Sequence, residues 1–300
     1  MFARMKLHWY RSKNFGDALS PLLVESLCGA SATYAHPGSA ELIAVGSVLF
    51  GGGALFVERK KLFTVIGVVK IARKAFDWLR PTLNIWGSGF LMDSGSEDVV
   101  RIRRTKVCAV RGKKTLEILR RTGFVKAEEL ENIALGDPGL LFPQLLQEKP
   151  PTQYDLGIVS HFRDMEEGVR LGQHFSSLGV HVKVVDVMQD DPVNVLREIA
   201  QCDKILSSSL HGLIVADAFQ IPNRHIVFST LGQTAREYLF KFDDYYSAFD
   251  VKPTECLSLN SVKGNELNIL RMIDAVAFPQ EKVRLIQDRL IKSFPVRCAV

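Results

Sequence analysis

Cysteine is scarce and scattered in this 300-residue chain. No pair of cysteines has the C-x-x-C spacing, and no cysteine pairs with histidine at a zinc-ligand spacing, so we predict neither a zinc site nor a disulfide framework. Thiols that stay reduced are typical of a cytoplasmic protein. The five cysteines are Cys28, Cys108, Cys202, Cys256 and Cys298.

Long apolar runs are also missing. No stretch reaches the roughly 18 consecutive apolar residues that a membrane-spanning helix needs. Residues 1–17 lack the apolar segment of a secretory signal peptide. We therefore expect a cytoplasmic protein that contacts a membrane, if at all, peripherally from the inner face.

Several common site signatures are absent. The glycine runs Gly51-Gly52-Gly53 and Gly87-Ser88-Gly89 match neither G-x-G-x-x-G nor the P-loop pattern, so neither a nicotinamide enzyme nor an NTPase is indicated. No cluster of acidic, histidine and cysteine residues suggests a metal, and no cofactor is expected. The net charge of +5 favours anionic small molecules or an anionic lipid surface, and it is too weak to indicate nucleic acid.

Short apolar strands alternate with helical patterns in the second half of the chain. The polar, proline-bearing stretch 147–153 marks a domain boundary, which gives an N-terminal domain of residues 1–150 and a C-terminal domain of residues 151–300. The alternation predicts right-handed βαβ units on a parallel sheet. Expected strands are 156–159, 180–187, 204–207 and 225–228, and expected helices are 165–178, 192–201 and 210–219.

The first half follows the same pattern less regularly. We therefore predict an α/β protein with two Rossmann-like domains and an active site in the cleft between them, where the carboxyl ends of the strands meet. Two C-terminal helices, 266–277 and 280–293, either complete the second domain or cross back to brace the first. Expected strands are 6–10, 42–45, 84–86 and 106–110, and expected helices are 18–27 and 113–121.

The run Ser207-Ser208-Ser209-Leu210-His211-Gly212 follows a predicted strand and opens a helix. Free backbone N–H groups and the helix dipole make such a corner favourable for anions. His211 in the first turn is suited to general acid or base work near neutral pH. The alternative is that Ser208 or Ser209 caps a helix and that His211 is a buried structural histidine.

Two other strand ends carry polar side chains. Asn14 and Asp17 open the first helix, where Asp17 either handles a sugar hydroxyl or acts as an N-cap. Arg111 follows a strand, where it either holds a carboxylate or phosphate or lies on the surface. Asp137 is expected to hold a turn.

Two polar runs in the second half are further candidates. His161 and Arg163 follow the first strand of the second domain and are in a position to reach the cleft. The run 241–246 combines Lys241 with Tyr245 and Tyr246, which either line a sugar site or form an ordinary helix end.

Taken together and in order, these segments resemble the polysaccharide pyruvyl transferase family, in its bacterial exopolysaccharide branch. The resemblance covers most of residues 14–246. It rests on 14–17, 45–49, 86–89, 110–112, 135–138, 160–161, 207–212, 216–218, 221–223 and 241–246.

The resemblance implies a fold similar to GT-B glycosyltransferases. It also implies phosphoenolpyruvate as donor and co-substrate, and a sugar pyruvate ketal as product. His211 and Asp17 become the expected catalytic residues. The expected donor-binding residues are Arg111, His161, Arg163, Ser208, Ser209 and Lys241, and the expected acceptor-binding residues are Asn14, Tyr245 and Tyr246.

Two departures from the family bear on function. Many relatives carry arginine at the position of Ser209, so another cation is needed here, with Arg163, Lys241 and Arg111 as candidates. The segment 59–83 is basic around an apolar stretch, and we interpret it either as an element that docks on anionic lipid beside a lipid-linked acceptor or as a packing helix.

Two other functions stay open at this point. A GT-B glycosyltransferase that uses a nucleotide sugar would share the architecture, and a non-catalytic partner in polysaccharide assembly would tolerate the missing arginine. Donor binding separates the first of these from pyruvyl transfer.

Overall fold

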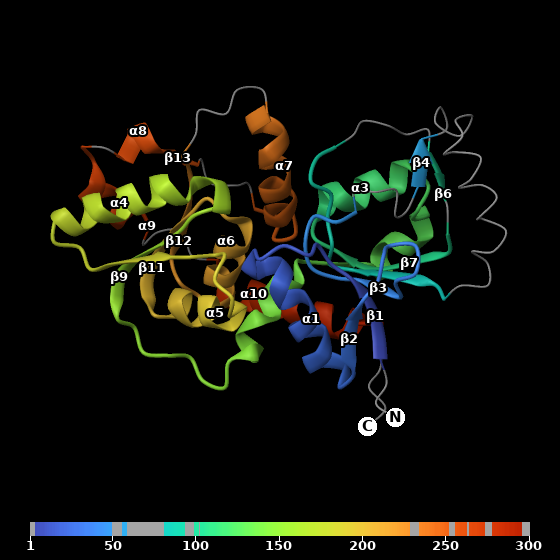
Figure 1. Cartoon of the computed structure of the whole chain (residues 1–300). Helices are drawn as coiled ribbons and strands as arrows, with labels where there is room; N and C mark the ends of the chain where they lie inside the picture. The colour runs from blue at the N-terminus through green and yellow to red at the C-terminus, as the bar shows by residue number, and fades with distance from the viewer. Residues whose placement is uncertain are drawn as a thin grey trace.

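The computed structural model describes residues 4–49, 56–58, 81–93, 99–101, 103–228, 234–251, 256–262, 264–273 and 278–295, with the side chains of 56–58, 99–101 and 234–238 left aside. It contains two parallel sheets interleaved with helices, which confirms the predicted α/β class with two Rossmann-like units (Figure 1). The region from 59 to 80, which holds most of the segment predicted to contact lipid, lies outside the described residues.

The N-terminal sheet has six strands in the order β2-β1-β3-β5-β7-β8, and every neighbouring pair is parallel. A separate antiparallel pair joins β4 (Phe56–Glu58) to β6 (Val99–Arg101). The strands of the six-stranded sheet are β1 (Arg4–His8), β2 (Ser31–Tyr34), β3 (Leu42–Ile43), β5 (Leu83–Trp86), β7 (Thr105–Val110) and β8 (Ala134–Leu135).

The C-terminal sheet has five strands in the order β10-β9-β11-β12-β13, again all parallel. Its outermost strands are short, while β9 and β11 at the centre are buried along most of their length, as expected for a sheet covered by helices on both faces. The strands are β9 (Tyr154–Val159), β10 (Val182–Val185), β11 (Cys202–Ser207), β12 (Asn223–Val227) and β13 (Leu257–Ser258).

Helices connect the strands. The α-helices are α1 (Phe15–Cys28), α3 (Lys113–Arg121), α4 (Met165–Ser177), α5 (Pro192–Ala200), α6 (Leu210–Ala218), α7 (Thr234–Ser247), α8 (Leu259–Val262), α9 (Glu266–Ile273) and α10 (Gln280–Ser293). The 3-10 helices are η2 (Ala127–Asn132), η3 (Pro138–Leu145) and η4 (Phe162–Asp164). No helix in the described part of the chain is long and apolar enough to span a bilayer.

The main apolar core runs through both halves of the molecule. One cluster joins Leu7 and Trp86 of the first sheet to Val159 of the second, through Phe142 on η3 and Leu213 on α6. One smaller apolar cluster packs on the first sheet, and another packs on the second. The two sheets therefore share one core where they adjoin, so that groups at the ends of their strands are held in fixed relation.

Helix α10 returns from the second half and packs on the first. It contacts β7, β8 and η3, whereas α9 stays against β11 (Figure 1). The indole Nε1 of Trp86 donates a hydrogen bond to the carbonyl of Leu290 at 2.9 Å, and the ring of Phe294 meets the indole edge-on at 4.8 Å between centroids. Of the two open expectations for the C-terminal helices, α10 therefore crosses back and α9 completes the second unit.

We predict that Trp86→Phe lowers the free energy of unfolding by about 1–3 kcal/mol, because it removes the indole bond to α10 and leaves a gap in a buried site. Urea unfolding would measure the loss. Trp9, which is only partly buried, gives the matched control, and Trp9→Phe should change the free energy of unfolding by less than about 0.5 kcal/mol. Equal losses in the two variants would contradict a bracing role for α10.

Candidate active site

His211 occupies the first turn of α6, directly after the carboxyl end of β11. Three serines precede it. The Ser207 hydroxyl lies within hydrogen-bond distance of the carbonyls of Val159 and Ser209, between which it shares its one proton, and it accepts from the Ser209 N–H, so it holds the turn. Ser209 is the N-cap residue, yet its side chain makes no cap bond. The alternative in which a serine side chain caps this helix is therefore wrong.

The His211 imidazole is buried between two phenylalanine rings, those of Phe15 and Phe142, each 6.3 Å away between centroids. Its Nε2 has no hydrogen-bond partner among the described residues. Burial, followed by the charges of Lys241 and Arg111, lowers the pKa of His211 to about 3. The ring is therefore neutral at physiological pH, and it would take up a proton only with added negative charge beside it.

The N-terminus of α1, a helix of the first half of the chain, lies against the ring of His211. A Cβ added at Gly16 would lie only 2.0 Å from Nδ1 of His211, so the two helix starts touch through a position where only glycine fits. This contact places Asp17, the next residue of α1, beside the same site. Helix α1 begins at Phe15 rather than at the predicted position 18, and Asp17 therefore lies in the first turn and is not the N-cap.

Asp17 is held by its own loop. Its Oδ2 accepts hydrogen bonds from the hydroxyl of Ser12 at 3.1 Å and from the amide of Asn14 at 3.2 Å. Burial raises its pKa to about 6, while these two bonds and the charge of Lys241 oppose the rise. Asn14, expected to contact the acceptor, thus orients Asp17. A carboxyl with a pKa near the working pH is suited to general base work.

The charge of Lys241, on α7, influences the pKa values of both Asp17 and His211. Its ammonium is buried, and burial, together with the charge of Arg111, lowers its pKa to about 7. The two carboxylates of Asp17 and Asp164 oppose this shift. Lys241 in turn affects the pKa of Asp17, His161, Asp164, His211 and His225. Its charge therefore acts on both Asp17 and His211.

The loop after β9 brings three more groups to this region. The backbone N–H of His161 donates to Ser208 Oγ at 2.8 Å, and the Ser208 hydroxyl donates to Asp164 Oδ2 at 2.8 Å. Ser208 therefore links the start of α6 to η4. Burial, then the charges of Lys241 and Arg163, lower the pKa of His161 to about 4. The Arg163 side chain is exposed, over the ring of Phe162.

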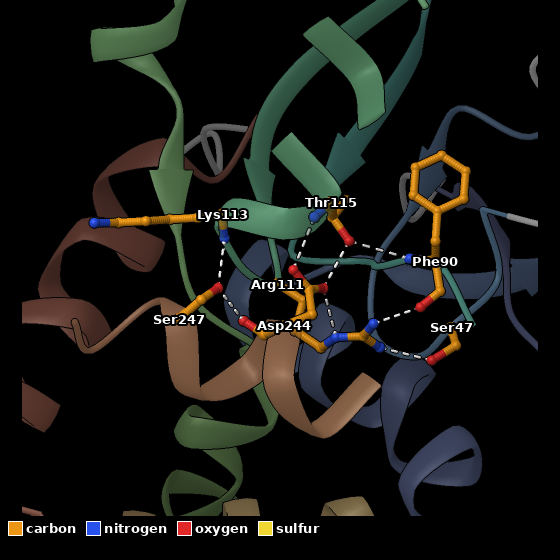
Figure 2. Close-up of polar contacts among 7 residues, drawn as sticks. All are labelled: Ser47, Phe90, Arg111, Lys113, Thr115, Asp244 and Ser247. Carbon is orange, nitrogen blue, oxygen red and sulfur yellow. Dashed lines mark hydrogen bonds and ion pairs between the residues drawn. The ribbon is translucent and has the colours of Figure 1, made fainter. Parts of the chain in front are cut away.

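Arg111 was expected either to hold a carboxylate or phosphate of a ligand or to lie on the surface, and the structure shows neither setting. It is fully buried, so it is not a surface arginine, and its three side-chain nitrogens already donate hydrogen bonds. The partners are Asp244, Ser47 and the carbonyl of Phe90 (Figure 2). This corrects the expectation of direct donor contact: Arg111 adds positive potential to the site while its guanidinium binds the protein itself.

The two tyrosines predicted to face a sugar are part of the core. Tyr245 is fully buried, and its hydroxyl donates to Asp217 at 2.8 Å. Tyr246 is buried against the ring of Phe278, 5.6 Å away between centroids. Neither ring has an open face for an acceptor, which corrects the expectation of stacking on sugar.

Some residues of the site carried no clear signal in the sequence. Asp164 stands three positions after His161 and had no pattern to mark it. Asp137 caps η3 through the N–H of Gly139, as expected for a turn residue, but its second oxygen has no partner among the described residues. The buried ring of His225 stacks on Phe242, the residue after Lys241, at 3.9 Å between centroids, and burial and then the charge of Lys241 lower its pKa to about 3.

No group of three or more histidine, cysteine or acidic residues that could hold a metal occurs in the described part of the chain. His211, Asp17 and Lys241 come from three helices, α6, α1 and α7. They are an imidazole whose Nε2 has no hydrogen-bond partner among the described residues, a carboxyl with a pKa of about 6, and a buried amine with a pKa of about 7.

Comparison with known proteins shows the family of the chain. A protein-family model described as polysaccharide pyruvyl transferase matches residues 14–229, a range that includes Asp17 and His211 and ends before Lys241. An uncharacterized protein of Acanthamoeba polyphaga mimivirus is 31% identical over 188 residues, which is 62% of this chain and 61% of that protein. The aligned region thus spans less than two thirds of that relative. The extent of the family match shows that this chain belongs to the polysaccharide pyruvyl transferase family.

Proposed function

We propose that the chain transfers a pyruvyl group from phosphoenolpyruvate to a hexose of a bacterial surface polysaccharide or of its lipid-linked precursor. The product is a pyruvate ketal, and phosphate is released. The observation that supports this most is that the charge of Lys241 acts on both Asp17 and His211, whose Nε2 has no hydrogen-bond partner among the described residues. A proton-accepting pair beside a buried cation suits an anionic donor and a hydroxyl acceptor.

The reaction requires three events at two neighbouring carbon atoms of the donor. The methylene of phosphoenolpyruvate gains a proton, a first sugar hydroxyl bonds to the neighbouring carbon, and the bond from that carbon to the phosphate oxygen breaks. A second hydroxyl then closes the ketal. The two hydroxyl protons balance the reaction, since one ends on the new methyl group and the other on the departing phosphate.

His211 is suited to move these protons. Once protonated, it can give its proton to the methylene and recover one from the first hydroxyl as that hydroxyl bonds to the neighbouring carbon. The phosphate and carboxylate of a bound donor would raise the pKa of the imidazole, since nearby negative charge favours the imidazolium form. Asp17, with its pKa near 6, is then available for the second hydroxyl.

Lys241 is our choice for the cation that takes the place of the family arginine at Ser209. The Arg163 side chain is exposed and Arg111 is bound to Asp244, whereas the Lys241 ammonium is buried beside Asp17 and His211. A partly desolvated cation binds an anion more strongly than an exposed one, because water screens the interaction less.

The Lys241 role predicts a pH dependence. An ammonium with a pKa near 7 loses its charge as the pH rises, so phosphoenolpyruvate binding should weaken above pH 7 by up to about tenfold per pH unit. Lys241→Arg should flatten this decline, because guanidinium stays protonated, and Lys241→Met should abolish tight binding. Calorimetric titration from pH 6 to 9 would measure it. Wild type and Lys241→Arg showing the same profile would contradict the assignment.

The function itself is tested by incubating the purified chain with phosphoenolpyruvate and candidate lipid-linked glycans. Phosphate release and a glycan mass gain of one pyruvyl group are expected together. Parallel samples with UDP- or GDP-sugars test the nucleotide-sugar alternative. Binding and turnover of a nucleotide sugar without any of phosphoenolpyruvate would overturn the proposal.

A further inference from the structure

Helix α7 contacts both halves of the molecule through two consecutive residues, Asp244 and Tyr245. It stands between the two sheets (Figure 1). Asp244 contacts the start of α3 in the first half, and Tyr245 contacts Asp217 on α6 in the second. Lys241 lies one turn before them, and side chains three and four residues apart share a helix face. Two neighbouring anchors therefore determine where the Lys241 ammonium lies.

The first anchor completes a helix terminus that lacks a cap of its own. Gly112 is the N-cap residue of α3 and offers no side chain, so the first N–H groups of the helix need outside partners. The N–H of Thr115 donates to Asp244 Oδ1 at 2.8 Å, and the N–H of Lys113 donates to Ser247 Oγ at 2.8 Å (Figure 2). Helix α7 thus caps α3 from a distant part of the sequence, with a negative charge at the positive end of the dipole.

The same carboxylate forms a buried ion pair. Asp244 Oδ2 accepts from Arg111 Nε at 2.9 Å and from the hydroxyl of Thr115 at 2.6 Å (Figure 2). Both charged side chains have zero exposure. A Cβ added at Gly112 would lie 1.7 Å from the backbone oxygen of Asp244, so the chain segments are in direct contact. A buried charge with this many partners has one well-defined position.

The second anchor joins α7 to the helix that carries His211. The Tyr245 hydroxyl donates to Asp217 Oδ2, and the other oxygen of Asp217 accepts from the amide of Asn223 at 2.6 Å. All three side chains are buried. Asp217 stands six residues after His211 on α6, so the distance from Lys241 to His211 depends on this bond as well.

We propose that Asp244, with Arg111 as its buried partner, is a positioning residue that holds α7 so that the Lys241 ammonium stays buried where its charge acts on Asp17 and His211. The importance of that cation for the donor rests on the proposed function. The position of the amine can be measured without any reaction. Loss of the Asp244 charge would leave Arg111 buried without its counter-ion, which strongly favours rearrangement of this contact.

The test compares Asp244→Asn with the matched control Asp243→Asn. Asp243 lies on the same helix and also pairs with α3, through Lys114 at 2.7 Å, but its side chain is 39% exposed. The first readout is the rate at which an amine-acylating reagent labels Lys241 as a function of pH, followed by peptide mass spectrometry. The second is the Kd for phosphoenolpyruvate.

In Asp244→Asn, the labelling midpoint of Lys241 should rise by one pH unit or more, because the amine moves into water. The Kd for phosphoenolpyruvate should rise at least tenfold, and the double variant Asp244→Asn/Lys241→Met should bind no more weakly than Lys241→Met alone. Asp243→Asn should match wild type in both measurements. A loss of thermal stability alone, with an unchanged midpoint and Kd, would overturn the proposal.

Two further outcomes are distinguishable. If the wild-type chain does not bind phosphoenolpyruvate, the proposed function fails, yet the labelling midpoint still decides the positioning role. If Asp244→Asn does not fold, Arg111→Lys keeps the positive charge while losing the planar fork, and a smaller midpoint shift in the same direction is expected. A folded Arg111→Lys with the wild-type midpoint would overturn the positioning role.

Discussion

Replacement of His211 by glutamine should reduce pyruvyl transfer by about 10²–10⁴-fold, the range in which a general acid–base residue contributes. Glutamine fills much of the space between Phe15 and Phe142 but cannot take up and return a proton. Phosphoenolpyruvate binding should stay within about threefold of wild type, because the charge of Lys241 is retained. Initial rates of phosphate release and calorimetric titration would separate the two effects.

The pH profile identifies the partner of His211. Since the pKa of His211 is about 3, its ring does not titrate in the free protein between pH 5 and 9. Activity should instead fall as the pH drops through about 6, where Asp17 takes up a proton and can no longer act as a base. Asp17→Asn should remove this acid limb along with most of the rate. His174→Gln, at an exposed histidine paired with Glu266, is the control and should behave as wild type. Full activity in His211→Gln would refute the acid–base role.

Gly16→Ala should reduce turnover by about 10²-fold, because a displacement of roughly 1 Å in a catalytic group has an effect of this size. The new methyl group would lie 2.0 Å from His211 Nδ1 and 2.3 Å from Cγ. These are atoms of a planar ring close to the helix backbone, so the imidazole or the whole start of α6 must move. Initial-rate measurements with saturating donor would record the loss.

The reason for the loss can be tested in a double-variant cycle. Gly16→Ala should lower the midpoint of thermal unfolding in the wild-type background but much less in His211→Ala, where the ring is gone. Gly29, at the other end of α1, has φ +63° and no atom within 4 Å of an added Cβ, so Gly29→Asn is the matched control with normal turnover. An equal thermal loss in both backgrounds would show that the methyl group clashes with something other than His211.

The sequence predicted regular elements well wherever a pattern repeats over several turns. Helices 113–121 and 280–293 have their predicted bounds, because apolar spacing and a clear stop define both ends. The strands were placed with ends that differ by about two residues, as for β9, which begins at Tyr154 and not at position 156. A strand end depends on pairing with its neighbour, and a single sequence does not contain that information.

The sequence indicated which residue types belong to the site, but it did not indicate which of them are buried or what they contact. Lys241 follows a helix pattern with no mark of proximity to Asp17, 224 positions earlier, and only the packing of two sheets brings them together. Arg111 and Tyr245 have side chains that suit ligands, but they are buried against Asp244 and Asp217, and a single sequence does not show these pairings. Burial is thus what the sequence alone conceals here.

The hydrogen bond from Trp86 to Leu290 also has a consequence for biosynthesis. Its partners are 204 residues apart in the chain. At a synthesis rate of about 5–20 residues per second, a ribosome needs about 10–40 s to make the residues between them. All six strands of the first sheet are made before α10, so the surface that α10 covers on β7 and β8 stays open to other nascent chains until the end of synthesis. This protein should therefore depend on a holding chaperone during translation and become independent of it once α10 has emerged.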